Sequence, residues 1–333
     1  MTSTEARGDS SPRRGWPHRP QREPGRSDEL AGISDDGLAP IEPTPSVVFD
    51  RPPRTKIALG LTIALVVGAG TAAYLETDAR TVPGTKNPPP ISWAPPPGGF
   101  FRLSAVGSYN QLPDDVAAAA AVHRSTWDIR PGNSSFNHTV PRNLKLRPVD
   151  PGSHAYDPRW NKVIVRRVSG QFTGTTDEIL QWGAVKWGLP DEVLRTVAVM
   201  ESDWDQNNTG DPVPQQQCPY PTAQPTCPLS FGLVGVNSRS FAGIFPWNRD
   251  STAANVDMLG GWLRGCYEGW VWWLRDHGNV SLGRYHSGDL WGCVGAWFSG
   301  NWYDGQVGTR SAVDYISRAR FWYDAKPWLR QNY

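Results

Sequence analysis

The fold is decided by the stretch WGLPDEVLRTVAVMES, residues 187–202, which joins two helical patterns and closes on a carboxylate. Gly188 ends the first pattern, and Pro190 suits the first turn of the second, whose apolar residues recur every third or fourth position. We therefore expect a helix from Pro190 to Met200. Glu201 then lies at its C-terminal end, beside the apolar face. Two interpretations of this position remain open: a carboxylate partly removed from water, as a general acid requires, or an exposed glutamate at a helix end.

A second helix is predicted directly upstream. Thr175 and Glu178 match a capping box, and the helical pattern that follows runs to Trp187. The first half of the 333-residue chain is rich in Pro, Gly and polar residues, so we expect one compact, mainly helical core, at residues 155–333. The formal net charge is +1, which gives no reason to expect a nucleic-acid partner.

The N-terminal part predicts a tail and a membrane anchor. Residues 1–55 have few aromatic side chains and many Arg, Pro, Gly, Asp and Glu, a composition typical of disorder. Residues 57–75 then contain no charge, and at about 1.5 Å per residue a helix of this length crosses most of a hydrocarbon layer of roughly 30 Å. We predict one transmembrane helix within residues 56–76.

The flanking charges give the orientation of this anchor. Arg51, Arg54 and Lys56 precede it, whereas Glu76 and Asp78 follow it, so the positive-inside rule places the tail in the cytoplasm and the remaining chain outside the cell. A cleaved signal peptide is the alternative, although a polar leader of this length exceeds an ordinary n-region. The localisation predicted is a single-pass protein of the cell membrane.

Residues 77–154 are predicted to be a Pro-rich spacer followed by an irregular segment that precedes the core. Two proline triplets favour an extended, semi-rigid chain that holds the core away from the membrane. Residues 114–122 are rich in alanine, which favours a short helix.

The four cysteines favour disulfides over a metal. Cys218, Cys227, Cys266 and Cys293 form no Cys-x-x-Cys pair and have no histidine at ligand spacing, so we expect no metal site and an oxidising compartment. Three pairings exist in principle. We prefer Cys218 with Cys227 and Cys266 with Cys293, with free buried cysteines as the alternative.

Several motifs together resemble the soluble lytic transglycosylase type of lysozyme-like domain, in a membrane-anchored bacterial form. The resemblance spans roughly residues 175–325. Its parts are Trp187-Gly188-Leu189-Pro190, Ala198-Val199-Met200-Glu201-Ser202, Ser230-Phe231-Gly232-Leu233-Val234-Gly235-Val236, residues 250–262, and Ala296-Trp297-Phe298-Ser299-Gly300. The resemblance implies a lysozyme-like fold, a catalytic Glu201 and no cofactor. It also implies that the partner is the glycan strand of peptidoglycan, cut during general wall turnover or within a secretion or cell-wall machinery.

The same resemblance implies a set of substrate-binding residues. These are Ser202, Ser230, Gly232 and Leu233, together with Trp297, and we add Trp302 because it follows the last motif closely. Two positions depart from the family pattern: Gly235 replaces a glutamine, and Trp297-Phe298 replaces a tyrosine-asparagine pair. These departures leave room for a domain that binds glycan as a scaffold without cutting it.

The implied reaction needs one carboxylic acid. Glu201 would protonate the glycosidic oxygen between N-acetylmuramic acid and N-acetylglucosamine, then take the proton of the muramoyl 6-hydroxyl as an anhydro sugar forms. A muramidase-type hydrolase is the alternative, and it would need a base for water. Asp211 is the candidate for that second carboxylate, with an exposed loop position as the competing interpretation.

Overall fold

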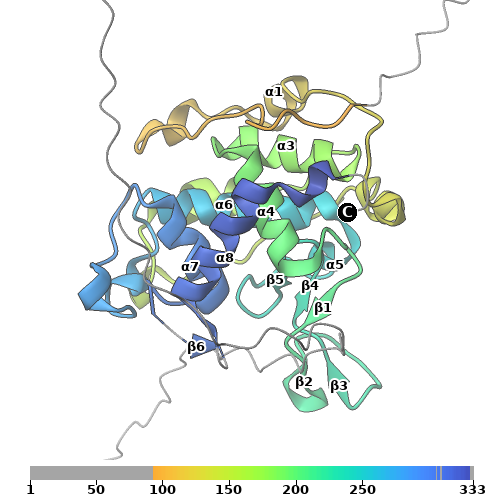
Figure 1. Ribbon diagram of the computed structural model, residues 1–333. Coiled ribbons are helices and arrows are strands. Elements are labelled where there is room, and N and C mark those ends of the chain that lie inside the picture. The colour runs from red at the N-terminus through yellow and green to blue at the C-terminus, as the bar shows by residue number, and fades with distance from the viewer. Residues whose placement is uncertain (1–92, 305, 308–309, 331–333) are drawn as a thin grey trace, which may run out of the picture. The chain divides into compact units, whose positions relative to one another are not determined.

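The computed structural model describes residues 93–304, 306–307 and 310–330 (Figure 1). The predicted tail at residues 1–55 and the predicted membrane helix at 56–76 lie outside these residues. Within the described part of the chain, no helix is both long and apolar enough to span a bilayer. The described residues are mainly helical, which confirms the expected fold class at that level.

Eight α-helices and seven short strands make up most of the regular structure in the described ranges. The α-helices are α1 Asp115–Ala120, α2 Ser134–Asn137, α3 Thr176–Trp187, α4 Asp191–Ser202, α5 Trp247–Asp250, α6 Thr252–Tyr267, α7 Leu290–Ser299 and α8 Ala312–Ala325. A π-helical segment covers Trp160–Val165, and short 3₁₀ turns include Trp272–Arg275 and Val280–Leu282. The strands are β1 Thr209–Gly210, β2 Val213–Pro214, β3 Thr226–Cys227, β4 Ser230–Phe231, β5 Val236–Asn237, β6 Gln306–Val307 and β7 Arg310–Ser311.

The centre of the fold is α6, because every one of its residues is buried. A helix that is enclosed on all sides must let its neighbours approach closely, and glycines in α6 do this. A Cβ atom at Gly260 would lie 2.3 Å from the Trp187 ring, and one at Gly265 would lie 2.6 Å from the Trp160 ring. These glycines therefore allow α3 and the π-helical segment to pack directly on the α6 backbone.

The two helices predicted around Gly188 are present. Thr175 caps α3, accepting from the Glu178 amide at 3.2 Å, while the Glu178 carboxylate accepts from the Thr175 amide at 2.9 Å. Gly188 ends α3 in the left-handed conformation, with φ of 61°, and Pro190 precedes α4. Both helices follow from local signals, namely a capping box and a glycine stop.

The strands form small hairpins rather than a large sheet. β1, β4 and β5 make a three-stranded antiparallel sheet in which Gly210 pairs with Ser230 and Phe231 pairs with Val236. β2 pairs with β3, and β6 with β7. Both expected disulfides are present, because Cys218 is bonded to Cys227 and Cys266 to Cys293. The first closes the hairpin of β2 and β3, and the second joins α6 to α7.

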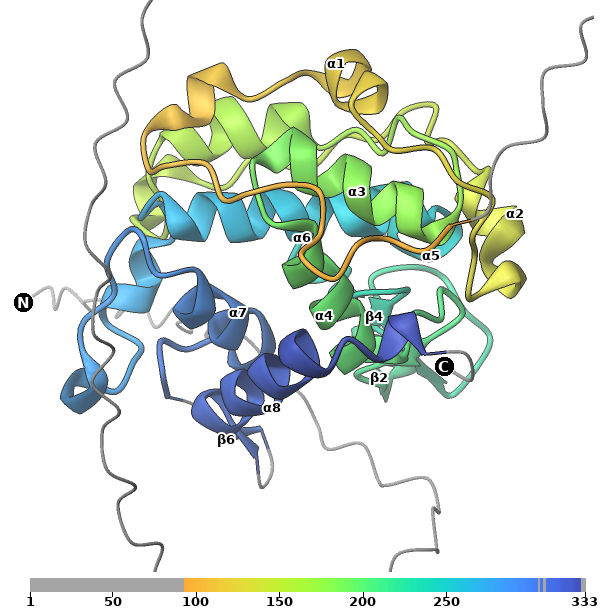
Figure 2. The ribbon, with the colours of Figure 1, turned by 45° about the horizontal axis from the view of Figure 1, so that its top comes forward.

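Residues 93–125, which we call the strap, cross the surface of the helices and are held by buried charges (Figure 2). Asp191 in α4 accepts from the amides of Phe100 and Phe101, each at 3.0 Å. In α6, Arg264 donates to the Ser104 carbonyl at 3.1 Å. The strap therefore supplies hydrogen bonds that α4 and α6 cannot make themselves, which a buried charge requires.

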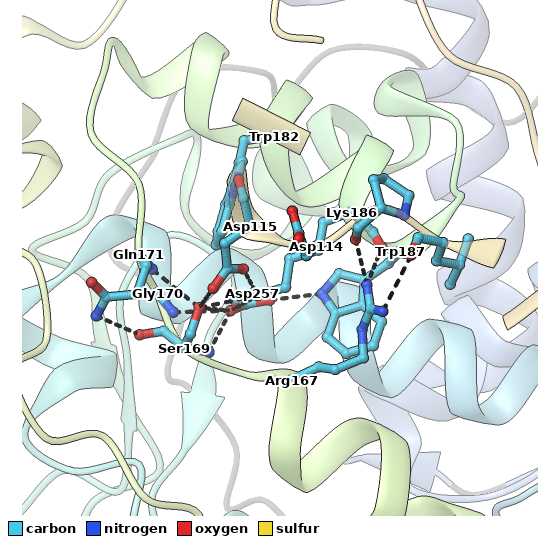
Figure 3. Close-up of polar contacts among 12 residues, drawn as sticks. Asp114, Asp115, Arg167, Ser169, Gly170, Gln171, Trp182, Lys186, Trp187 and Asp257 are labelled. Atoms are coloured by element: carbon cyan, nitrogen blue, oxygen red, sulfur yellow. Dashed lines mark hydrogen bonds and ion pairs between the residues drawn. The ribbon is translucent and has the colours of Figure 1, made fainter. Parts of the chain in front are cut away.

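The same arrangement continues at α1, which lies within the predicted helix at residues 114–122. The Lys186 ammonium is 1% exposed and lies 2.6 Å from the Asp115 carboxylate of α1 and 2.7 Å from the Asp257 carboxylate of α6 (Figure 3). Asp257 also accepts from the Trp187 indole at 2.7 Å. Helices α1, α3 and α6 thus meet at one cluster of paired charges.

The buried core begins before residue 155. Ala118, Val122 and Leu146 belong to the same cluster of buried apolar side chains as the helices of the C-terminal part, and all described residues from Trp93 onward lie in one compact unit. Residues 93–154 are therefore part of the packed unit.

Candidate active site

Glu201 lies in the last turn of α4, and the chain reverses directly after it. Asp203 and Trp204 both adopt left-handed backbone conformations, with φ of 52° and 66°. Such conformations cost about 1 to 2 kcal/mol for residues with a side chain, so the surroundings must enforce them. The buried Trp204 ring does so, since its Nε1–H donates to the Arg195 carbonyl of α4 at 3.1 Å.

The Glu201 carboxylate is half-buried and is held by a residue from the far end of the chain. The hydroxyl of Tyr315, in α8, donates to Glu201 Oε1 at 2.7 Å. The Tyr315 ring stacks on Phe298 of α7, with 4.5 Å between ring centres and 9° between planes. The position of the carboxylate is therefore fixed by α4, α7 and α8 together.

The start of α8 is well defined, which fixes Tyr315 in turn. Ser311 and Asp314 form a capping box, in which Ser311 Oγ accepts from the Asp314 amide at 3.0 Å. Hydrogen bonds from the Ser311 side chain and backbone lower the pKa of the Asp314 carboxyl below its ordinary value. The cap keeps this carboxylate charged at the helix N-terminus, where negative charge is favourable.

The turn between β4 and β5, residues 232–235, lies beside the end of α4. Ser202 Oγ donates to the Leu233 carbonyl at 2.7 Å, so the residue after Glu201 joins the end of α4 to the turn between β4 and β5. Gly232 in this turn has φ of 80°, and a Cβ atom there would lie 2.4 Å from Asn255 Nδ2. Both the conformation and the close approach require glycine. Ser202 acts here as a support for Glu201.

Asp211 is not an exposed loop residue. Its carboxylate is buried, accepts from the Ser230 hydroxyl and also accepts from Asn237 Nδ2 at 3.1 Å. These contacts join the chain after β1 to β4 and β5. Among the predicted binding residues, Ser230, Gly232 and Leu233 are buried as well, so these three residues shape the turn from within and present no surface to a ligand.

The two predicted tryptophans differ in accessibility. Trp297 is partly exposed, and its Nε1–H donates to the Val234 carbonyl at 3.2 Å, which places it against the same turn as Ser202. Its ring also stacks on Phe241 at 5.8 Å. Trp302 is only 1% exposed, and a Cβ atom at Gly292 would lie 2.3 Å from its ring. Trp302 therefore packs in the core and offers no face to a sugar.

Several residues of this region were not found by sequence reasoning. Tyr315 contacts Glu201 from 114 positions away, and no local pattern marks it. Asn208 donates to the Glu201 carbonyl at 3.0 Å from the loop after α4. Asn255 donates to the Phe231 carbonyl at 2.8 Å and accepts from the Val234 amide at 2.8 Å. A signal for Asn255 exists, since an amide within the apolar pattern of α6 must find buried partners.

The chemistry available around Glu201 is that of one carboxylic acid, which is held by the Tyr315 hydroxyl. No group of three potential metal ligands occurs in the described part of the chain. A pocket of about 120 Å³ is lined by residues that include Phe241, Tyr156 and Met258, and none of the predicted site residues lines it, although Phe241 stacks on Trp297.

Comparisons with known proteins give no relative. No family model matches the chain, and no curated protein and no solved structure matches it either.

Proposed function

We propose that the chain is a peptidoglycan lytic transglycosylase with a lysozyme-like domain and Glu201 as its catalytic acid and base. The observation that carries the proposal is the position of the Glu201 carboxylate. It is half-buried at a helix end, hydrogen-bonded by Tyr315 and tied through Ser202 to the glycine turn at Gly232. A carboxyl group with one oriented face and restricted solvent is suited to transfer protons to and from a bound glycan.

In the proposed reaction, Glu201 first gives its proton to the glycosidic oxygen between N-acetylmuramic acid and N-acetylglucosamine. Because Oε1 already accepts the Tyr315 hydrogen, we place the transferred proton on Oε2. The acetamido group of the sugar stabilises the positive charge at C1. The bond between C1 and the glycosidic oxygen breaks, and the N-acetylglucosamine part leaves as an alcohol that keeps the proton from Glu201. The muramoyl 6-hydroxyl oxygen then bonds to C1 and gives its proton to the Glu201 carboxylate, so that an anhydro sugar forms and no water is consumed.

The place of action proposed is outside the cell. The two disulfides support an oxidising compartment, and residues 57–75, before the domain, are the anchor that we propose from the sequence. Both the extracellular location and the proposed reaction favour peptidoglycan as the partner. Service to a secretion or conjugation system belongs to the same proposal, and a gene neighbourhood of transfer genes would support it.

A second candidate function is an inactive peptidoglycan-binding scaffold. Phe298, at a position where the family pattern has asparagine, is used to stack on Tyr315, and the Trp297 indole is used to hold the turn at Val234. Neither side chain then offers the hydrogen bonds expected of that motif. A hydrolase with Asp211 as base has less support, since that carboxylate holds Ser230 and Asn237.

The test is mass spectrometry of soluble products released from purified peptidoglycan by the full chain, with Glu201→Gln as the matched variant. We expect anhydro-muropeptides from the unmodified protein and none from Glu201→Gln. Products with reducing ends would indicate a hydrolase. A folded protein that sediments with peptidoglycan but releases nothing would support the scaffold and contradict the proposal.

A further inference from the structure

Residues 276–289, which we call the tip loop, join the 3₁₀ turn Trp272–Arg275 to α7 and project from the body of the described unit in two views (Figures 1 and 2). The outermost part is the 3₁₀ turn Val280–Leu282. Val280 is 71% exposed and Leu282 is 53% exposed. Two branched aliphatic side chains are thus exposed within three residues of each other at the end of a projection, where they form a small apolar tip.

The structure holds this tip in place. The Asn279 side chain accepts from the Ser281 amide at 3.1 Å and so shapes the turn. At the base of the loop, the Trp302 amide donates to the His277 carbonyl at 2.8 Å, and the Asn279 amide donates to the Trp302 carbonyl at 2.9 Å. Because the Trp302 ring is buried, the base of the tip loop is fixed to the core.

The surroundings of the tip are basic and aromatic. Arg275 and Arg284 are exposed on either side of it, and Arg275 lies over the ring of the partly exposed Trp272 at 5.0 Å. Asp276 is the exposed acidic residue of the loop, whereas Asp289 at its end caps α7 by accepting from the Gly292 amide. Aliphatic tips beside Arg and Trp match the composition of proteins that bind the interface of a bilayer.

A further exposed aliphatic side chain lies at the base of the loop. Val106 of the strap is 43% exposed, and its Cγ2 would be 3.8 Å from a Cβ atom at Gly288. This third exposed aliphatic side chain thus lies at the base of the tip loop and comes from a part of the chain that is far away in sequence.

We propose that the tip loop inserts Val280 and Leu282 into the surface of a lipid bilayer, with Arg275 and Arg284 at the headgroups of anionic lipids. This inference rests on the proposed membrane anchor at residues 57–75 and is independent of the proposed reaction. It gives the domain a second point of contact with the membrane and thereby a fixed orientation.

The shape of the tip loop favours a bilayer over a protein as its binding partner. A stable protein interface buries about 800 Å² on each partner and needs a broad complementary surface. The tip loop is a narrow projection whose two aliphatic side chains lie at its end. A bilayer accepts such a projection without a matching surface, and its anionic headgroups attract the flanking arginines.

The small size of the tip also limits its role. A single myristoyl chain gives only marginal, reversible membrane binding, and stable attachment needs a second signal. Two aliphatic side chains offer less apolar surface than that chain, so the tip loop cannot recruit the protein alone. The tip loop contacts the bilayer only because the proposed anchor already confines the domain near the membrane, where the local concentration of lipid surface is high.

The experiment uses the full chain reconstituted in vesicles of phosphatidylglycerol and a zwitterionic lipid with brominated acyl chains. All four native cysteines are in disulfides, so Ser281→Cys provides a single thiol for a fluorescent label. Val116→Cys is the matched control, because Val116 is 78% exposed but lies on α1. We expect the label at residue 281 to be quenched several-fold more than the label at residue 116.

A further variant tests the aliphatic side chains themselves. Val280→Asp with Leu282→Asp, combined with Ser281→Cys, should reduce the quenching to the level of the control label. Equal quenching at residues 281 and 116 would overturn the proposal. Flotation of the vesicles tests the anchor separately from the tip contact. Protein that floats without quenching contradicts the tip contact alone. Protein that does not float contradicts both the anchor and the tip contact.

Discussion

The proposed chemistry depends on the contact between Glu201 and Tyr315. The tyrosine hydroxyl lies 2.7 Å from the carboxylate, and the ring is held separately by its stack on Phe298. Removing the hydroxyl therefore changes the hydrogen bond and leaves the packing in place. This separation makes the role of Tyr315 testable without disturbing the fold.

We predict that Tyr315→Phe slows product release from peptidoglycan about tenfold to a hundredfold, since a hydrogen bond to a charged group contributes about 1.5 to 3 kcal/mol. The measurement is the initial rate of soluble muropeptide release. Thermal unfolding should show a folded protein that has lost no more than the contribution of this one hydrogen bond, about 1.5 to 3 kcal/mol. An unchanged release rate would show that Tyr315 has no part in the reaction.

Gly232 is the second residue with a specific expected effect. Gly232→Ala introduces a Cβ atom 2.4 Å from Asn255 Nδ2 at a φ of 80°. Gly107→Ala is the matched control, since Gly107 has φ of 87° and nothing within 4 Å of an added Cβ. We expect the control to lose about 1 kcal/mol of unfolding free energy through its backbone alone, and Gly232→Ala to lose clearly more.

Urea unfolding measures the loss of unfolding free energy in both glycine variants. Equal losses would mean that the turn adjusts to the added methyl group and that the close approach to Asn255 is not required. A larger loss for Gly232→Ala, together with reduced product release, would show that the turn beside Ser202 must keep its present form.

The two disulfides stabilise different parts of the molecule. Cys218–Cys227 closes a hairpin whose own buried cluster contains only Val213, Cys227 and Leu229 among the described residues. Cys266–Cys293 joins α6 to α7, and both of its cysteines are fully buried. A small cluster of this kind cannot hold a hairpin alone, whereas the main core has many other contacts.

We predict that Cys218→Ala with Cys227→Ala opens the hairpin locally, and that Cys266→Ala with Cys293→Ala destabilises the whole unit. The sequence separations of 9 and 27 correspond to roughly 2.6 and 3.5 kcal/mol in the chain-entropy model, and the second pair adds the loss of buried sulfur contacts. Limited proteolysis within residues 213–227 and urea unfolding distinguish the two. Protection of that segment in the first double variant would refute the local role of its disulfide.

Helices with strong local signals could be predicted from the sequence. The capping box at Thr175 and Glu178, the glycine stop at Gly188 and the proline before α4 each act within a few residues, and the structure confirms them. The cysteine pairing was also correct, because short separations favour closure. Tyr315 and the burial of Trp302 depend on packing between distant segments, for which one sequence carries no local signal.

The strap makes the chain before residue 155 part of the molecule that must fold. Buried charges in α3, α4 and α6 depend on it: Asp191 accepts from two strap amides, Arg264 donates to strap carbonyls, and Lys186 pairs with Asp115. The sequence composition did not show that buried charges depend on the strap, because irregular segments have no periodicity. The hydrogen bonds they provide to buried charges are visible only in three dimensions.

We predict that a chain starting at residue 155 fails to fold, whereas a chain starting at residue 93 folds. Without the strap, Asp191 and Arg264 lose hydrogen-bond partners that the fold provides, Lys186 loses Asp115, and the main cluster loses the buried side chains of Ala118 and Val122. Circular dichroism and cooperative thermal unfolding of both fragments provide the measurement. A cooperative transition at the same temperature for both would show that the strap is dispensable.

The contact between Gly107 and Glu268 spans 161 positions of the chain. At a translation rate of about 5 to 20 residues per second, the strap emerges roughly 8 to 32 seconds before the glutamate that receives its amide. During that interval the Gly107 amide and the Ser104 and Ala105 carbonyls of the strap lack their native partners Glu268 and Arg264. The order of synthesis therefore requires the earliest packed segment to wait until the end of α6 has been made, and a chaperone at the ribosome or at the export channel would be most valuable in that period.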